Sequence, residues 1–210
     1  MRSRTDFAGS STRRLQRRTS KRIVTNNGDT MPDRAITPRP PPLLVLYADE
    51  NAAEFGPEPI YGQYPRGLIK KILPWLLCAR HEILHVCSGC LPKGEGIRVD
   101  LRIAARPDVI ADGRNLPFAD GSHAAVMLDP PYCEEYAKSL YGIEYPRPAH
   151  LLKEAARVVR PGGRIAFVHY ITPKPVDGTR FVKSFGLSIG FDMPMRAVSI
   201  YQRDDAELAL

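Results

Sequence analysis

The sequence predicts an α/β fold built on a mainly parallel sheet. Short apolar runs alternate with stretches of helical spacing, which is the pattern of strands connected by helices. In addition, a polar residue closes each of four successive predicted strands: Ser88, Asp100, Asp112 and Asp129. Ligands of parallel sheets bind beyond the carboxyl ends of the strands. The sequence therefore predicts a functional site at that edge.

The composition is that of an ordinary globular protein. The chain has 210 residues, 43% of them hydrophobic and 25% charged, which is enough for one domain with a sizeable core. No apolar run has the length of a membrane span, and no apolar segment follows the basic N-terminus as in a secretory signal. We expect a cytoplasmic protein with reduced cysteines and no membrane partner.

Residues 1–42 carry the whole charge surplus. They hold ten basic and three acidic side chains, a surplus of seven, which equals the net charge of the chain. Because large apolar groups are few, we expect a disordered tail ahead of a domain at residues 43–210. A basic tail can hold nucleic acid through Arg13, Arg14, Arg17 and Arg18. The alternatives are a solvated tail, or an extension upstream of a start at Met31.

The first half of the domain contains a helix and three strands. Residues 43–48 form a short apolar run that fits a strand or an edge segment. Pro65 opens a helix that Pro74 should kink. Its apolar residues have helical spacing: Leu68, Ile69, Ile72, Leu73, Leu76 and Leu77. Strands are expected at 83–87, 97–100 and 108–112.

The second half begins with the strand Ala124–Leu128, which delivers Asp129. A helix follows with an apolar face made of Leu151, Leu152, Ala155, Ala156 and Val159. We expect it to end at residues 160–163, where two glycines can cap it. Strands at 164–170 and 196–202 complete the pattern.

One motif points to a family. Asp129-Pro130-Pro131-Tyr132, with the approach "RNLPFADGSHAAVMLDPPY" and the downstream "LLKEAARVVRPGGRIAFVHY", resembles the catalytic region of class I S-adenosylmethionine-dependent methyltransferases. Within that class it resembles the amino-methyltransferases of nucleic acids, and the resemblance covers roughly residues 61–203. It implies a Rossmann-like, seven-stranded sheet, mostly parallel with an antiparallel last strand.

The resemblance also implies S-adenosylmethionine as the cofactor. "GQYPRGLIKKIL" is similar to a helix that lines the methionine pocket in several of these enzymes. The implied cofactor contacts are Tyr64, Pro65, Ser88, Gly89, Asp100, Asp112, Arg114, Asn115 and Leu116. Asp100 would accept from both ribose hydroxyls and Asp112 from the adenine amine, which suits the two acceptor oxygens of a carboxylate. Taken singly, each aspartate is also an ordinary turn or helix-cap residue.

The first loop departs from the family pattern. Residues 86–96 lead straight into the next strand, and parallel strands normally need a dozen or more connecting residues. Little room separates Asp100 from Asp108 either. The chain is therefore a compact variant of the fold, or the first or second strand is misplaced.

The implied catalytic residues are Asp129, Pro130, Pro131 and Tyr132. Asp129 and the Pro130 carbonyl can accept the two hydrogens of an aromatic amine, and the prolines hold these acceptors rigidly. Tyr132 can stack on the base. The alternative is a plain turn after a strand.

Two neighbouring patterns have functional and structural interpretations. In residues 133–148, Tyr136, Tyr141 and Tyr145 interleave with Lys138 and Arg147. This spacing suits contact with an unstacked base and its phosphates, or the segment is an amphipathic helix on the sheet edge. The second pattern has zinc-ligand types at His81, His85, Cys87 and Cys90. Since these residues divide between a helix and a strand, we expect no metal site.

We expect methyl transfer to an exocyclic amine of a nucleobase, with adenine N6 in DNA as the first choice. The alternatives are an RNA amine methyltransferase, acting on transfer or ribosomal RNA, and a non-catalytic nucleic-acid-binding module of the same fold. No segment is large enough for a target-recognition domain. In this compactness the chain resembles the small phage-type DNA methyltransferases. Specificity is then relaxed, or a homodimer or partner subunit supplies it.

Overall fold

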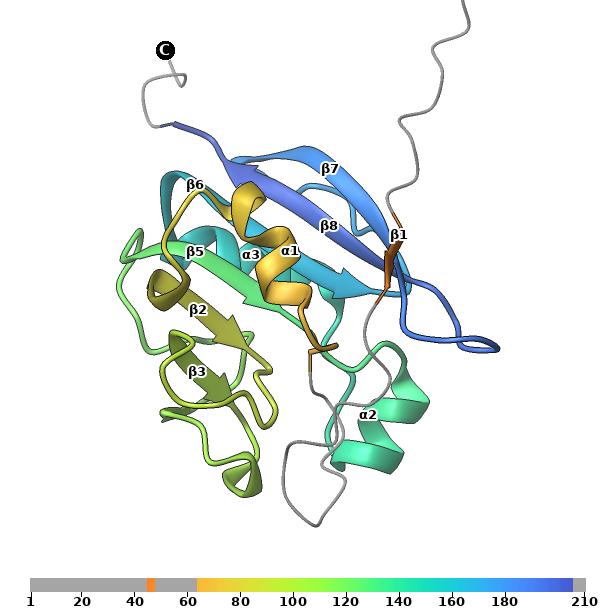
Figure 1. Cartoon of the computed structure of the whole chain (residues 1–210). Coiled ribbons are helices and arrows are strands. Elements are labelled where there is room, and N and C mark those ends of the chain that lie inside the picture. Colours follow the sequence, from red (N-terminus) through yellow and green to blue (C-terminus); the bar gives the residue numbers. More distant parts are fainter. Residues whose placement is uncertain (1–44, 48–63, 206–210) are drawn as a thin grey trace, which may run out of the picture. The chain divides into compact units, whose positions relative to one another are not determined.

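The chain folds around one mixed β-sheet (Figure 1). The computed structural model describes residues 45–47 and 64–205. The strand order is β1-β7-β8-β6-β5-β2-β3-β4. The strands are β1 (Val45–Tyr47), β2 (Ile83–Val86), β3 (Ile97–Asp100), β4 (Val109–Ile110), β5 (His123–Leu128), β6 (Val159–His169), β7 (Thr179–Ser188) and β8 (Arg196–Arg203). Only β8 runs antiparallel to its neighbours, β6 and β7. The expected mostly parallel α/β fold with an antiparallel last strand is confirmed.

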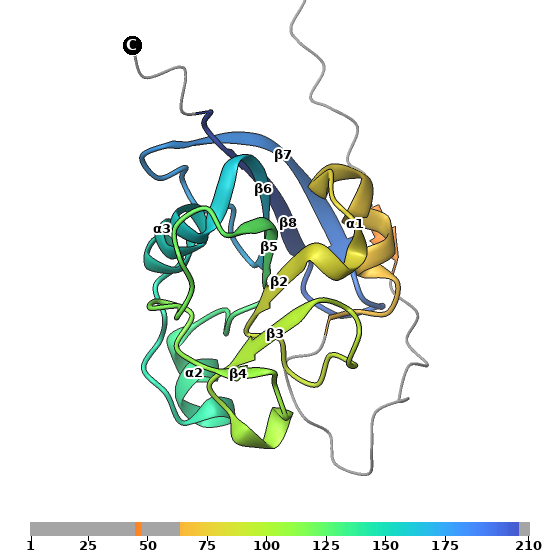
Figure 2. The same cartoon turned by 90° about the vertical axis from the view of Figure 1, so that its left-hand side faces the viewer.

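Helices cover both faces of the sheet (Figure 2). Helix α1 (Leu68–Leu76) packs on one face, against alternate residues of the central strands that include Met127 and Val168. Helix α3 (Pro148–Val158) packs on the other face, against Leu128 and Phe167. Because successive side chains of a strand point to opposite faces, the two apolar cores share the same strands. The short α2 (Glu134–Tyr141) follows β5.

Three local expectations were wrong. Leu77 adopts a left-handed conformation with φ of 54° after the end of α1, and its side chain is exposed rather than on the apolar face. Helix α3 is not capped by glycines, because Val159 is already extended and begins β6. Strand β7 was not foreseen, since its side chains show no apolar alternation over residues 179–184.

The region from β2 to β4 has no crossover helix. Residues 87–96 link β2 directly to β3, and residues 101–108, which contain only the 3₁₀ turn Ile103–Ala105 (η2), link β3 to β4. Both pairs are nevertheless parallel. The compact variant of the fold is therefore the observed one, with the first strands where the sequence placed them.

A buried arginine supports this helix-free region. Arg98 on β3 is 4% exposed, and its guanidinium donates to both oxygens of Asp108, at 2.9 Å each. It also donates to the Leu91 carbonyl at 2.8 Å, in the loop ahead of β3. Its charge lowers the pKa of Asp108 through the hydrogen bonds. The hydrogen bonds of Arg98 thus stabilise the β2–β3 and β3–β4 loops, where no helix packs over the chain.

None of the helices in the described segments combines the length and apolarity that a bilayer crossing requires.

Candidate active site

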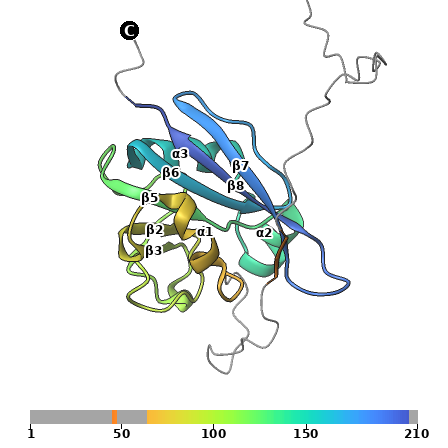
Figure 3. The ribbon, with the colours of Figure 1, turned by 45° about the horizontal axis from the view of Figure 1, so that its top comes forward.

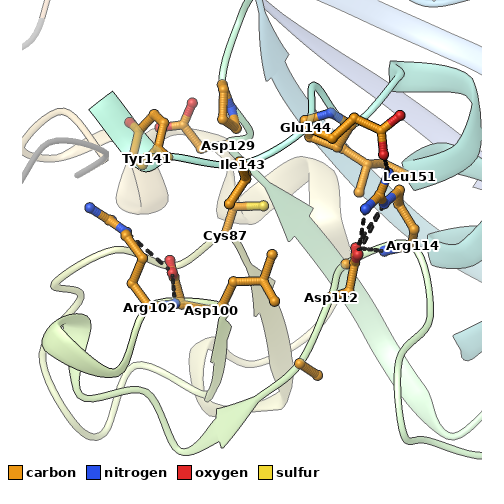
Figure 4. A pocket seen from close by; sticks show the side chains of 15 residues that line it. Cys87, Asp100, Arg102, Asp112, Arg114, Asp129, Tyr141, Ile143, Glu144 and Leu151 are labelled. Carbon is orange, nitrogen blue, oxygen red and sulfur yellow. Dashed lines mark hydrogen bonds and ion pairs between the residues drawn. The ribbon is translucent and has the colours of Figure 1, made fainter. Parts of the chain in front are cut away.

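A pocket opens at the carboxyl ends of β2, β3 and β5 and at the loop after β4 (Figure 4). Its cavity volume is about 40 Å³, and the wider recess, open solvent included, is about 570 Å³. Its polar walls are Asp100, Arg102, Asp112, Arg114 and Asp129, and Cys87, Tyr141 and Leu151 are among its other lining residues. We call it the carboxylate pocket. The structure thus brings together three of the four strand-end polar groups that the sequence singled out.

Asp100 is anchored at the end of β3. The residue is only 7% exposed. Its carboxylate accepts hydrogen bonds from the backbone N–H groups of Gly89 and Arg102, at 2.9 Å each. The Arg102 side chain approaches as well: its Nε lies 3.4 Å from Asp100 Oδ1, the oxygen that also accepts from the Arg102 backbone N–H. A carboxylate offers about four lone-pair positions, so Asp100 keeps acceptor capacity toward the pocket.

Asp112 is already bound by its neighbour Arg114. The Arg114 backbone N–H donates to Oδ1 at 2.8 Å, and the guanidinium donates to Oδ2 at 2.8 and 3.0 Å. These bonds lower the pKa of Asp112. Arg114 also reaches Glu144 at 3.1 Å, in the segment after α2. A ligand amine at Asp112 would therefore compete with a guanidinium.

The loop after β2 has an unusual backbone. Cys87 is left-handed with φ of 55° although it carries a side chain, and Gly89 follows with φ of 53°. For a residue with a side chain, such as Cys87, this conformation is costly and concentrates at functional sites, whereas glycine adopts it freely. Ser88 is 1% exposed, and its hydroxyl has no hydrogen-bond partner within the described part of the chain. Burial raises the pKa of Cys87, as do Asp100 and Asp129, so its thiol stays neutral.

Asp129 is the most perturbed carboxyl of the site. It is 6% exposed, and one oxygen accepts from the Tyr132 hydroxyl at 2.5 Å. Desolvation by burial raises its pKa to about 6. A carboxyl with such a pKa is ionised at neutral pH and still accepts a proton readily.

A second hollow borders the same carboxylate. Its cavity volume is about 360 Å³, and the wider recess, open solvent included, is about 880 Å³. We call it the tyrosine hollow, and its lining residues include Asp129, Pro130, Tyr132, Tyr136, Tyr141, Tyr170, Met193 and Arg196. Asp129, Pro131 and Tyr141 line both cavities. The two cavities therefore meet at Asp129.

The Tyr132 ring is held from several directions. Its centroid lies 4.6 Å from that of Tyr170 and 5.5 Å from that of His169, and the Arg196 guanidinium carbon lies 5.0 Å from it. Tyr145 donates to the Tyr132 carbonyl at 3.4 Å and lies 3.2 Å from His169 Nε2.

The tautomer of His169 follows from its other contact. Its Nδ1 accepts from the Ile171 N–H at 3.2 Å, so Nε2 carries the hydrogen and donates to Tyr145. Burial lowers the pKa of His169 to about 4, which keeps it neutral. Sequence reasoning missed His169, Tyr170 and Arg196, although His169 and Arg196 do lie at strand ends. It singled out Tyr145 for contact with a base, but not for this hydrogen bond.

The remaining expected site residues lie outside the two cavities. Tyr64 donates to the Met127 carbonyl at 3.2 Å on the α1 side of β5, and Pro65 precedes α1. Leu116 is 3% exposed and packs in the α3 core, and Asn115 is exposed beside it. Lys138 is exposed on α2. Arg13, Arg14, Arg17 and Arg18 fall outside the described residues.

The histidine and cysteine cluster shows no metal geometry. His85 Nε2 lies 2.8 Å from the Glu95 carbonyl, and burial lowers the pKa of His85 to about 4. Across residues 64–205, no group of three or more histidine, cysteine or acidic side chains is arranged to hold a metal ion.

The Rossmann-like fold of this chain is shared with a protein of solved structure. The solved structure of TrmN from Thermus thermophilus matches 69% of this chain and 51% of its own chain, with a TM-score of 0.51 and 17% sequence identity.

Sequence comparisons reach only part of the chain. No family model matches it. The demethylmenaquinone methyltransferase of Corynebacterium efficiens is 38% identical over 77 residues, which is 36% of this chain and 29% of that protein. That of Beutenbergia cavernae is 34% identical over 87 residues, 41% of this chain and 30% of that protein. The chain thus spans less than a third of the length of these relatives.

Proposed function

We propose that this chain is an S-adenosylmethionine-dependent methyltransferase that methylates the exocyclic amine of a nucleobase, with adenine N6 in DNA as the first candidate. One observation carries the proposal: Asp129 is the shared wall of two cavities, one lined by carboxylates and the other by tyrosines. A transferase needs this arrangement, because donor and acceptor must meet at one point from two sides.

The carboxylate pocket suits the proposed cofactor. Asp100 retains acceptor capacity for the ribose hydroxyls, and the buried, unpartnered Ser88 hydroxyl marks an unfilled hydrogen bond in the adjoining loop. The Arg114 guanidinium already donates to the Asp112 carboxylate, so Arg114 would present its planar face to the adenine ring of the cofactor. When bound, S-adenosylmethionine supplies an electrophilic methyl group on a sulfonium.

The chain's own residues prepare the acceptor amine. The lone pair of an aromatic amine is delocalised into the ring, which makes it a poor nucleophile. Asp129 and the Pro130 carbonyl would each accept one amine hydrogen and so direct the lone pair toward the carboxylate pocket. The rigid Pro130-Pro131 pair keeps both acceptors in place. With its pKa raised to about 6, Asp129 can take the proton that nitrogen releases after methylation.

The tyrosine hollow supports a flat aromatic acceptor. Tyr132, Tyr136 and Tyr170 give it aromatic walls, and base–aromatic stacking is worth about 1–3 kcal/mol per base. Arg196 adds hydrogen-bond donors beside Asp129, and its buried Nε has no partner within the described residues. Ring nitrogens next to an exocyclic amine are acceptors that would suit these donors.

A second candidate acceptor is a lipid quinone ring. The partial relatives are demethylmenaquinone methyltransferases, and Leu140 and Met193 make part of the hollow's lining apolar. In that case Asp129 would take a proton from the ring rather than from an amine.

Labelled cofactor tests these candidates directly. The protein is incubated with methyl-labelled S-adenosylmethionine and, separately, plasmid DNA, transfer RNA, ribosomal RNA and a dispersed demethylated quinol, and nucleic acids are digested to nucleosides. We expect label in N6-methyl-2′-deoxyadenosine from the DNA. Label in an RNA nucleoside would move the proposal to RNA, and label in the quinol alone would overturn it. Absence of label, together with no calorimetric heat with the cofactor, would favour a binding module.

We propose further that nucleic acid is the partner of the N-terminal tail, and that a homodimer or a partner subunit supplies target specificity. Deleting residues 1–42 should weaken DNA affinity and flatten its salt dependence, because fewer phosphate charges are neutralised. An unchanged salt slope would make the tail passive.

A further inference from the structure

The β7–β8 loop, residues 189–195, presents an uncovered apolar tip. Its sequence is IGFDMPM. Phe191 is 95% exposed, Met193 is 52% exposed and Met195 is 48% exposed. Figures 1 and 3 show this loop extending past the end of the sheet. A single exposed apolar residue is ordinary, but three within five positions of one loop mark an interaction surface.

This tip adjoins the site rather than a remote surface. Met193 lines the tyrosine hollow, and Arg196, the first residue of β8, lines it as well. The turn itself is shaped by Asp192, a residue with a side chain at φ of 56°. Aspartate tolerates the left-handed conformation that such a turn requires.

The burial of Asp129 sets a condition on any duplex substrate. Asp129 is only 6% exposed, so an amine on a stacked, paired base could not reach it. The target nucleotide would have to leave the helix and enter the tyrosine hollow. Extrusion leaves a gap in the base stack, and proteins that open base stacks often insert Phe, Met or Pro between bases.

We propose that the β7–β8 loop is a wedge for double-stranded DNA, with Phe191 occupying the space that the extruded adenine leaves. The inference rests on the proposed function and adds how the substrate is made accessible. Phe191 supplies the flat aromatic surface that stacks on the neighbouring bases, and Met193 joins this contact to the hollow that receives the flipped base.

The test compares duplex with single-stranded DNA of the same sequence. Sheared plasmid DNA is used native or heat-denatured with methyl-labelled S-adenosylmethionine, so no recognition site needs to be known. Phe191→Ala should lower the methylation rate of the duplex about tenfold and that of the denatured strands less than twofold, because only the duplex requires unstacking. Phe181→Ala is the matched control, since Phe181 is a 45% exposed phenylalanine near the opposite end of β7. It should change neither rate.

The remaining outcomes overturn the inference. An equal loss on both substrates would make Phe191 a general component of the site, and no loss on either would make it irrelevant to DNA. If Phe191→Ala lowers binding to phosphatidylcholine vesicles and leaves duplex methylation intact, the loop tip binds a lipid surface instead. Absence of label in either form of DNA with the wild type overturns the proposed function itself, and the wedge falls with it.

Discussion

The two halves of the sheet are built differently. We call the half with β6 and β8 the catalytic side, after the role proposed for Asp129, and the half with β3 and β4 the cofactor side, after the role proposed for Asp100. On the catalytic side, β6 (Val159–His169) and β8 (Arg196–Arg203) are long, and their buried residues pack into the cores of α1 and α3. On the cofactor side, β3 and β4 are short, and exposed aliphatic side chains such as Ile103 and Ile110 remain. The catalytic side depends on apolar packing, whereas the cofactor side depends on ion pairs and strand-end carboxylates.

The largest expected effect tests this contrast in stability. Phe167→Ala, in the α3 core, should lower the free energy of unfolding by about 3–5 kcal/mol, because it leaves a cavity among fully buried side chains. Ile110→Ala on β4 should change it by no more than about 0.5 kcal/mol, since that side chain is 58% exposed. Urea denaturation measures both. Similar losses would mean that the cofactor side is packed as tightly as the catalytic side.

The next effect concerns the stability cost of Asp129. Its pKa is about 6 in the folded protein and lower in the unfolded chain, where the ordinary value is 3.8. The folded state therefore binds the proton more tightly, and stability is lost as the pH rises through 6. Asp129→Asn should then stabilise the protein by about 3 kcal/mol at pH 8 and by only about 0.5 kcal/mol near pH 4.

Urea denaturation at pH 8, 6 and 4 measures that difference. Asp204→Asn, which removes an exposed carboxylate, is the control and should show no such trend. A stabilisation by Asp129→Asn that is the same at all three pH values would contradict the raised pKa.

A smaller effect separates cofactor affinity from turnover. Asp100→Asn should weaken binding of S-adenosylmethionine about tenfold, because a charged acceptor of the ribose hydroxyls becomes a neutral one. The backbone bond from Gly89 can persist to the amide oxygen. Calorimetry gives the affinity, and the rate at saturating cofactor should stay within twofold. Unchanged affinity would remove Asp100 from the cofactor site.

The smallest effect tests the support of Tyr132. Tyr145→Phe removes the hydrogen bond to the Tyr132 carbonyl and the contact with His169, worth about 1 kcal/mol. We expect turnover to fall about threefold with unchanged cofactor affinity. Tyr201→Phe is the matched control, because it breaks a buried bond to the Pro173 carbonyl instead, and should lower stability but leave turnover unchanged. Equal turnover losses would mean a purely structural role for Tyr145.

The sequence predicted the strand ends better than the side chains that surround them. Asp100, Asp112 and Asp129 could be placed because each closes an apolar run, and parallel strands align their carboxyl ends. The Tyr145–His169 pair could not be placed, since these residues lie far apart along the chain and meet only through the sheet. Likewise, the occupation of Asp112 by Arg114 depends on a loop conformation that no periodicity encodes. Strand β7 was missed because its partner β8, rather than its own pattern, determines it.

The central claim is that the Asp129 carboxylate acts on the acceptor between the two cavities. The single-turnover rate of Asp129→Asn at pH 8, with saturating cofactor and DNA, tests it most directly. We predict a loss of about a thousandfold, within the range that a positioned acid–base group contributes, while calorimetric cofactor affinity stays within threefold. A rate within tenfold of the wild type, with affinity intact, would contradict the claim.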